Sequence, residues 1–284
     1  MLPTASGFHT ALQRKRVDVR RNEFRRSIFS SLLRLLCLLP LVLSGNLLST
    51  KAAPSTANRI VCRPELSASH RRELVEKLRR ITGWQDLDFD ADGKLIMNRA
   101  GFSGGSQTAR ELLSAAAGGE TMIVLEEASD RSDVVFCRVV EGRWKNGADG
   151  KPPVYVVLID FADFAHVLGD RDALAAFNVG WGLLHELDHV VNDTYDPARA
   201  TTGEAGNCEA LVNRMRRECG LAERADYFYT YEPGSRASAF KTKLVRLAFD
   251  QRQTATGKTK RHWIIWDASI VGGLPEPERV AALR

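Results

Sequence analysis

Apolar residues recur at helical spacing in four segments of the chain. In the first segment, Leu74, Leu78 and Ile81 share one helix face, and Ser67 stands where an N-cap is expected. Gly220 follows the last segment and is typical of a helix C-terminus. The predicted helices cover residues 67–81, 106–118, 172–191 and 207–219.

Shorter apolar runs rich in β-branched residues predict strands. Two of them flank Asp92-Gly93, a dipeptide that favours a tight hairpin turn. The predicted strands cover residues 87–89, 95–97, 122–125, 134–140, 154–159, 240–249 and 262–266, the last two forming a C-terminal hairpin. Helices and strands come first, two helices lie in the middle and strands end the chain. This order predicts an α+β fold with a mixed sheet.

The positive charge of the chain is concentrated in its first 51 residues. The 284 residues carry a formal net charge of +5, but residues 1–51 hold nine Lys/Arg and two Asp/Glu. The remainder, with 31 basic and 33 acidic residues, is slightly acidic. A body of this charge has no electrostatic footprint for nucleic acid, so a nucleic-acid partner is not expected. The arginine runs of the body, including 214–217, are interpreted as solvated helix faces because acids lie near them.

Residues 1–53 have the pattern of an export leader. A basic run over 20–26 precedes an apolar run over 31–48, and small residues follow it, which is typical of a secretory signal. The alternative is an uncleaved anchor, in which case only this N-terminal segment would contact the membrane. In both cases we expect residues 54–284 to form one domain outside the cytoplasm, whether secreted, periplasmic or anchored.

Four cysteines of the body form an even set that an oxidising compartment would allow to pair. Cys208 and Cys219 share one predicted helix and would lie roughly 16 Å apart, too far to bridge each other. Bridges from Cys62 or Cys137 to that helix stay open.

The chemistry of the chain is concentrated in the sequence HELDH at residues 185–189. His185 and His189, four residues apart, stack on one helix face, so that both imidazoles can reach one metal ion. Glu186 lies beside them and can contact a metal-bound water without being a ligand. This arrangement is that of the zincin metallopeptidases. The metzincin extension is excluded because Asn192 and Tyr195 stand where glycine and histidine are required.

The downstream sequence resembles the gluzincins, zincins whose third zinc ligand is a glutamate on the next helix. Glu209 follows His189 by twenty residues, with Asn207 just before it, as in thermolysin-like members. The resemblance covers about residues 180–215. It departs from thermolysin at Cys208, which separates Asn207 from the glutamate, and at Asn213, which replaces the aspartate expected to hydrogen-bond a ligand histidine. Glu204 is the alternative third ligand, and Asp193 and Asp196 are weaker ones.

The resemblance implies one zinc per chain, held by His185, His189 and Glu209, with the fourth position left to water. Glu186 would act as general base and then acid in the cleavage of a peptide or protein substrate. The strand over 154–159 is either a substrate-aligning edge strand or a central core strand. Donors to the developing oxyanion are sought among residues after the ligand helix, namely Tyr227, Tyr229, Tyr231 and His262.

The sequence thus predicts an exported, zincin-like zinc hydrolase, most directly a metallopeptidase. Two rival hypotheses stay open. One is a non-catalytic envelope protein with a structural zinc or none. The other is a zinc hydrolase that cleaves a non-peptide amide, because a fold does not fix the substrate.

Overall fold

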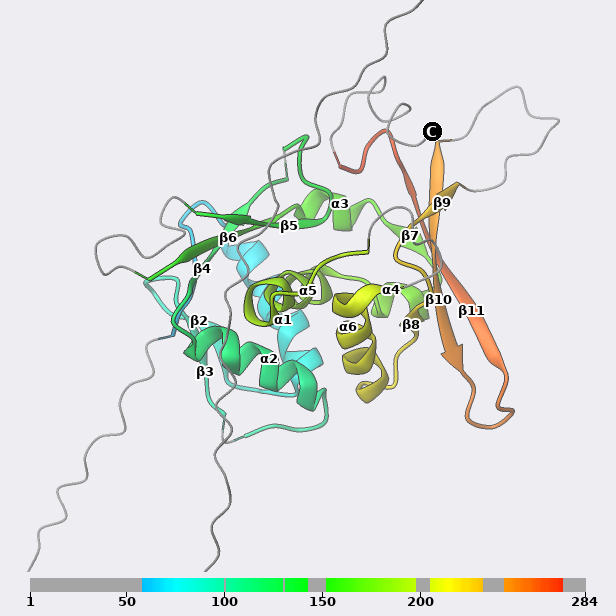
Figure 1. Cartoon of the computed structure of the whole chain (residues 1–284), viewed down its shortest axis with the longest axis horizontal. Coiled ribbons are helices and arrows are strands. Elements are labelled where there is room, and N and C mark those ends of the chain that lie inside the picture. Colours follow the sequence, from blue (N-terminus) through cyan, green and yellow to red (C-terminus); the bar gives the residue numbers. More distant parts are fainter. Residues whose placement is uncertain are drawn as a thin grey trace, which may run out of the picture. The chain divides into compact units, whose positions relative to one another are not determined.

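The computed structural model describes residues 58–99, 101–129, 131–142, 152–197, 205–231 and 243–272. These residues all belong to one unit, Ala52–Arg284. The predicted leader and Glu204 lie outside the described residues. Within them, six helices accompany three sheets (Figure 1), so the predicted α+β class is confirmed.

The largest apolar core lies against a four-stranded mixed sheet. Its strands follow the order β1 (Ile60–Cys62), β4 (Met122–Glu127), β6 (Val154–Ile159) and β5 (Cys137–Glu141). The first three strands are parallel to one another, whereas β5 pairs antiparallel with β6. The strand over 154–159 is therefore central, which decides between its two predicted roles. The edge strands are β1 and β5, and β5 is the one beside α5.

Four helices pack together beside this sheet: α1 (Ala68–Thr82), α2 (Gln107–Gly118), α5 (Val179–Asn192) and α6 (Gly206–Glu218). The predicted N-cap Ser67 is confirmed, because its hydroxyl accepts a hydrogen bond from the backbone of His70. The hydroxyl of Ser106 caps α2 in the same way and accepts a hydrogen bond from the backbone of Ala109. In the described ranges no helix is both long and apolar enough to cross a bilayer.

The prediction of one continuous helix over 172–191 was wrong. It consists of α4 (Arg171–Ala175) and α5, separated near Asn178. The Asn178 side chain accepts a hydrogen bond from the backbone N–H of Gly180, which begins a new helix. The indole of Trp181 donates to the carbonyl of Ala175, at 3.0 Å, and so satisfies a carbonyl at the end of α4. Side-chain capping thus interrupts an otherwise continuous apolar period.

The predicted C-terminal hairpin is confirmed as β10 (Leu244–Arg252) and β11 (Thr259–Asp267). Three two-residue strands extend it into a five-stranded sheet: β7 (Leu168–Gly169) pairs with β11, while β8 (Glu223–Arg224) and β9 (Thr230–Tyr231) pair with β10. This sheet covers a second apolar core that includes Phe249 and Trp266. The remaining elements are α3 (Phe161–Ala165) and the predicted hairpin β2 (Leu87–Phe89) and β3 (Leu95–Met97).

Each of the four body cysteines carries a free thiol. Cys219 lies at the end of α6 with its thiol directed at the Ile81 carbonyl, and the buried Cys208 thiol contacts His185. Burial raises the pKa of the Cys219 and Cys208 thiols to about 11. Disulfide pairing, which the even number of cysteines had left open, is thus absent between these four residues.

Candidate metal centre

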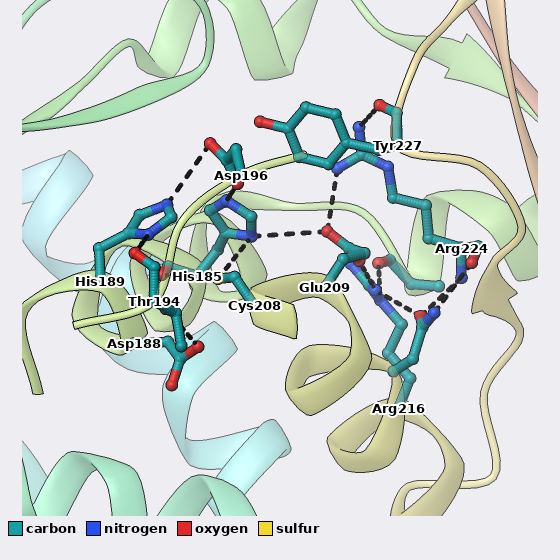
Figure 2. Close-up of polar contacts among 12 residues, drawn as sticks. His185, Asp188, His189, Thr194, Asp196, Cys208, Glu209, Arg216, Arg224 and Tyr227 are labelled. Carbon is teal, nitrogen blue, oxygen red and sulfur yellow. Dashed lines mark hydrogen bonds and ion pairs between the residues drawn. The ribbon is translucent and has the colours of Figure 1, made fainter. Parts of the chain in front are cut away.

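The two histidines of HELDH lie next to each other on α5, as their spacing predicts. Their ring centroids are 4.9 Å apart, and the ring planes are nearly perpendicular. The carboxylate of Asp196, beyond the end of the helix, faces both rings (Figure 2). Its oxygens lie 3.1 Å from Nε2 of His185 and 3.5 Å from Nε2 of His189.

These separations suit a shared metal ion. Ligands about 2.1 Å from a tetrahedral zinc are separated from one another by about 3.4 Å. The two contacts of Asp196 fall on either side of that value. His185, His189, Asp196 and Cys208 offer ligand atoms that all lie within 4.8 Å of one another, so this group could hold a metal ion. Imidazole nitrogens with a carboxylate oxygen are donors that zinc accepts.

A short turn after α5 brings Asp196 to the histidines. The helix ends at Asn192, and Asp193 takes the left-handed conformation with φ 51°. The fully buried carboxylate of Asp188 accepts hydrogen bonds from the side chains of Asn192 and Thr194. These bonds hold the returning chain against the last turn of α5.

The same turn orients His189. Nδ1 of His189 lies 2.8 Å from the carbonyl oxygen of Thr194, so this nitrogen carries the proton. The other nitrogen, Nε2, faces the Asp196 carboxylate, and the hydrogen bond to that carboxylate raises the pKa of His189. A backbone carbonyl behind an imidazole is a common way to fix the tautomer of a metal-binding histidine.

Glu209, predicted as the third ligand, contacts His185 from the other edge of its ring. The Glu209 carboxylate lies 3.5 Å from Nδ1 of His185, and the Cys208 thiol lies 3.2 Å from the same nitrogen. Glu209 is almost fully buried and pairs with Arg216 and Arg224. Burial alone would raise its pKa, but the two guanidinium groups hold the pKa of Glu209 well below its usual range. The carboxylate is therefore ionised, and it is already engaged by two cations.

Glu186 belongs to α5, and its side chain points toward the edge strand β5. Its carboxylate accepts a hydrogen bond of 2.8 Å from the backbone N–H of Val139, and burial raises the pKa of Glu186. This close approach depends on Gly182, one turn earlier in α5. A Cβ there would lie 2.8 Å from Sγ of Cys137 and 2.9 Å from the ring of Phe164. The close packing at this glycine thus sets where Glu186 meets the strand.

Of the four predicted oxyanion donors, Tyr227 lies beside the four possible metal ligands His185, His189, Asp196 and Cys208, called the metal group below. Its ring stacks on His185 with the centroids 6.3 Å apart, and its hydroxyl points toward Asp196 (Figure 2). Burial, together with a hydrogen bond to Asp196, raises the pKa of Tyr227, so the phenol stays protonated. The other three lie among different neighbours. Tyr229 packs on Trp266, Tyr231 is half-exposed in β9, and buried His262 faces Asp170 and Asp172.

Several residues of the site were not predicted from the sequence. Arg216, which the charge pattern assigned to a solvated face, is only 2% exposed. In the family pattern, the residue at position 213 hydrogen-bonds a ligand histidine, but Asn213 does not contact one. Its side chain instead accepts from the N–H of Arg224 at 2.7 Å and donates to the carbonyl of the same residue at 2.8 Å. The spacing of Glu209 and Arg216, seven residues and two helical turns, was the available signal.

The chain matches no protein-family model, no curated protein and no solved structure in these three comparisons. The site is therefore interpreted from its own geometry.

Proposed function

We propose that this protein is a zinc-dependent hydrolase of zincin type, most directly a metallopeptidase, with His185, His189 and Asp196 as the zinc ligands. The observation that carries the proposal is the position of the Asp196 carboxylate, which faces Nε2 of both histidines. Three protein ligands leave one position for water, as catalytic zinc sites require.

Glu209 is assigned to the support of His185 rather than to the metal. One of its oxygens pairs with Arg216 and the other with Arg224, so its charge is already balanced by two cations. A carboxylate on the Nδ1 edge of a ligand histidine strengthens and orients the Nε2 donor. The gluzincin-like assignment of Glu209 as the third ligand is the alternative that the experiment below distinguishes.

Bound zinc would supply a Lewis acid and a water molecule of lowered pKa. Glu186 is the proposed base that takes the proton from this water and returns it to the leaving amine. Burial raises the pKa of Glu186, which favours a group that must first accept a proton and then release it. Tyr227 is a protonated hydrogen-bond donor over the same site and is the proposed partner of the developing oxyanion.

The edge strand β5 supports a peptide as the substrate. Among the strands it has β6 on one side only, and on its other side the backbone N–H of Val139 donates to Glu186. An extended peptide added along that side would run past the proposed base. A non-peptide amide is the second candidate substrate. The expectation of export from the leader is part of this proposal, and no nucleic-acid partner is included in it.

Zinc content of the purified protein and four variants tests the ligand assignment. We expect about one zinc per chain in the parent, loss of zinc in His189→Ala and Asp196→Ala, and weakened but measurable binding in Glu209→Gln. Asp193→Asn is the matched control, because asparagine tolerates the left-handed conformation found there, and this variant should keep its zinc. Retention of zinc in Asp196→Ala with loss in Glu209→Gln would return the ligand role to Glu209.

Glu186→Gln tests the enzyme hypothesis separately. This variant should bind zinc and fold like the parent but fail to cleave a peptide library or amide-containing cell-wall fragments. Full activity in Glu186→Gln would overturn the assignment of the base. A folded parent that binds no added zinc would instead favour the non-catalytic envelope protein.

A further inference from the structure

Arg224 makes three hydrogen bonds around the metal group, although it has no role in the proposed reaction. It belongs to the short strand β8, and its side chain is 16% exposed. The guanidinium donates to Glu209 at 3.0 Å and to the carbonyl of Tyr227 (Figure 2). It also donates to the carbonyl of Asp226 at 3.0 Å. One planar group thus joins the ligand-supporting carboxylate to the loop that carries the phenol.

The first branch leads through Glu209 to His185. Arg224 and Glu209 form a charge-assisted hydrogen bond, and the same Glu209 oxygen faces Nδ1 of His185 at 3.5 Å. Because Nδ1 and Nε2 belong to one rigid ring, the position of this carboxylate determines where Nε2 points.

The second branch leads through Tyr227 to Asp196. The guanidinium carbon of Arg224 lies 4.9 Å from the centre of the Tyr227 ring, within cation–π distance, while Nη2 holds the carbonyl of the same residue. Backbone and ring of Tyr227 are therefore fixed together. The Tyr227 hydroxyl in turn points toward the Asp196 carboxylate, its hydrogen-bond partner (Figure 2).

Arg224 is itself held in place. The side-chain amide of Asn213 on α6 makes two hydrogen bonds with its backbone, one in each direction. The second guanidinium at Glu209, that of Arg216, instead donates to the carbonyl of Ala176 and to Asn213, inside the core. Arg216 therefore ties α6 to the core, whereas Arg224 is the one whose bonds reach both sides of the metal group.

We propose that Arg224 is a positioning residue that sets the angle between the His185 and Asp196 ligands, acting through Glu209 on one and through Tyr227 on the other. The inference rests on the proposed zinc site and adds a residue to it. Removal of Arg224 should leave all three ligands present but misaligned. The expected consequence is weaker and less regular metal binding, with a loss of about 10- to 100-fold in affinity, as is typical of residues behind the ligands.

The test compares Arg224→Gln and Arg224→Lys with the parent by competition of Zn²⁺ against a chelator and by the visible spectrum of bound Co²⁺. Glutamine should lower the affinity about 10- to 100-fold and change the Co²⁺ bands. Lysine restores a charge opposite Glu209 but cannot donate to three partners in one plane, so it should recover part of the affinity without restoring the parent spectrum. Arg217→Gln removes an exposed ion pair with Glu223 and should match the parent.

Double-variant cycles separate positioning from general stability. If Arg224 acts through Tyr227, the combined loss in Arg224→Gln/Tyr227→Phe should be smaller than the product of the two single losses. Strict additivity with both Tyr227→Phe and Glu209→Gln would overturn the inference, as would parent-like affinity and spectrum in Arg224→Gln. If Arg224→Gln does not fold, the cycle is run with Arg224→Lys and read in the same way. Absence of zinc binding in the folded parent would overturn the proposed function itself, whereas a parent that binds zinc normally confines any failure to Arg224.

Discussion

The carboxylate of Glu209 lies 3.5 Å from Nδ1 of His185 and thus contacts the ring on the edge opposite Nε2. A carboxylate in that position can orient the ring and increase the basicity of its other nitrogen. Under the proposed ligand set, Glu209 would support His185, whereas the resemblance to gluzincins would make it a ligand of the metal itself.

Gly182 allows α5 to approach the edge strand, so Gly182→Ala should damage both fold and site. We expect a loss of about 1–3 kcal/mol in the free energy of unfolding, because the new methyl group would overlap Cys137 and Phe164. Hydrolysis should fall as well, since Glu186 is displaced from Val139. Gly118→Ala, at the end of α2, is the control and should change stability little, because a Cβ added there would meet no atom of another element within 4 Å. Urea unfolding of both variants provides the measurement, and equal stability of Gly182→Ala and parent would contradict it.

Thr194 links the turn that carries Asp196 to the buried carboxylate of Asp188. Thr194→Val keeps the shape of the side chain but leaves one hydrogen bond of Asp188 unmade, with an expected cost of about 1–3 kcal/mol. Zinc affinity should also fall, because the same residue provides the carbonyl behind His189. Calorimetry with Zn²⁺ measures both effects. Thr254→Val, exposed in the β10–β11 loop, should show neither. A parent-like zinc affinity in Thr194→Val would show that the turn does not depend on this bond.

Glu218 at the end of α6 joins two helices in a pH-dependent way. Its carboxylate accepts hydrogen bonds from the hydroxyls of Ser106 and Thr108 and from the backbone N–H of Thr108 at the start of α2. Although burial opposes it, these bonds lower the pKa of Glu218 to about 2. The folded-state pKa is below the unfolded one, so the stabilisation is complete above about pH 4.5 and is lost as the pH falls toward about 2.

Glu218→Gln should therefore be less stable than the parent at pH 7, and the difference should shrink over that acid range. Chemical denaturation at a series of pH values measures it, with the exposed Glu120→Gln as the control. A stability difference that does not change between pH 5 and pH 2.5 would rule out this carboxylate as the source.

The four body thiols should all be free. Alkylation of the unfolded protein without reductant, followed by mass spectrometry, should label Cys62, Cys137, Cys208 and Cys219. In the native protein, the fully buried Cys208 should be labelled more slowly than the partly exposed Cys219. Any disulfide-linked peptide between two of them would contradict the structure.

Much of the fold could be predicted where a local signal and the apolar period agree. Ser67 and Ser106 mark helix starts because their hydroxyls satisfy free N–H groups, and Asp92-Gly93 marks a turn because glycine accepts a positive φ. The helix break at Asn178 was missed because apolar spacing continues through it, and only the side-chain bond to Gly180 distinguishes a cap from a helix interior.

The arrangement of the candidate ligands on α5 could be predicted from the sequence, but the position of Asp196 after the helix could not. The four-residue spacing of His185 and His189 follows from helix geometry alone. The position of Asp196 depends on a left-handed residue and on bonds to buried Asp188, and neither follows from sequence distance. Arg216 was misplaced because a run of arginines indicates charge without indicating which helix face turns inward.

The turn anchored by Asp188 brings together residues that are close in the sequence. His185, His189 and Asp196 all fall in one uninterrupted stretch, with the first and last only eleven positions apart. Closing so short a loop costs little chain entropy, and no docking of distant elements is needed to bring these donors together. Binding of a metal ion to these three residues would therefore stabilise the C-terminal turn of α5. The extent to which that turn frays would then depend on the concentration of the metal.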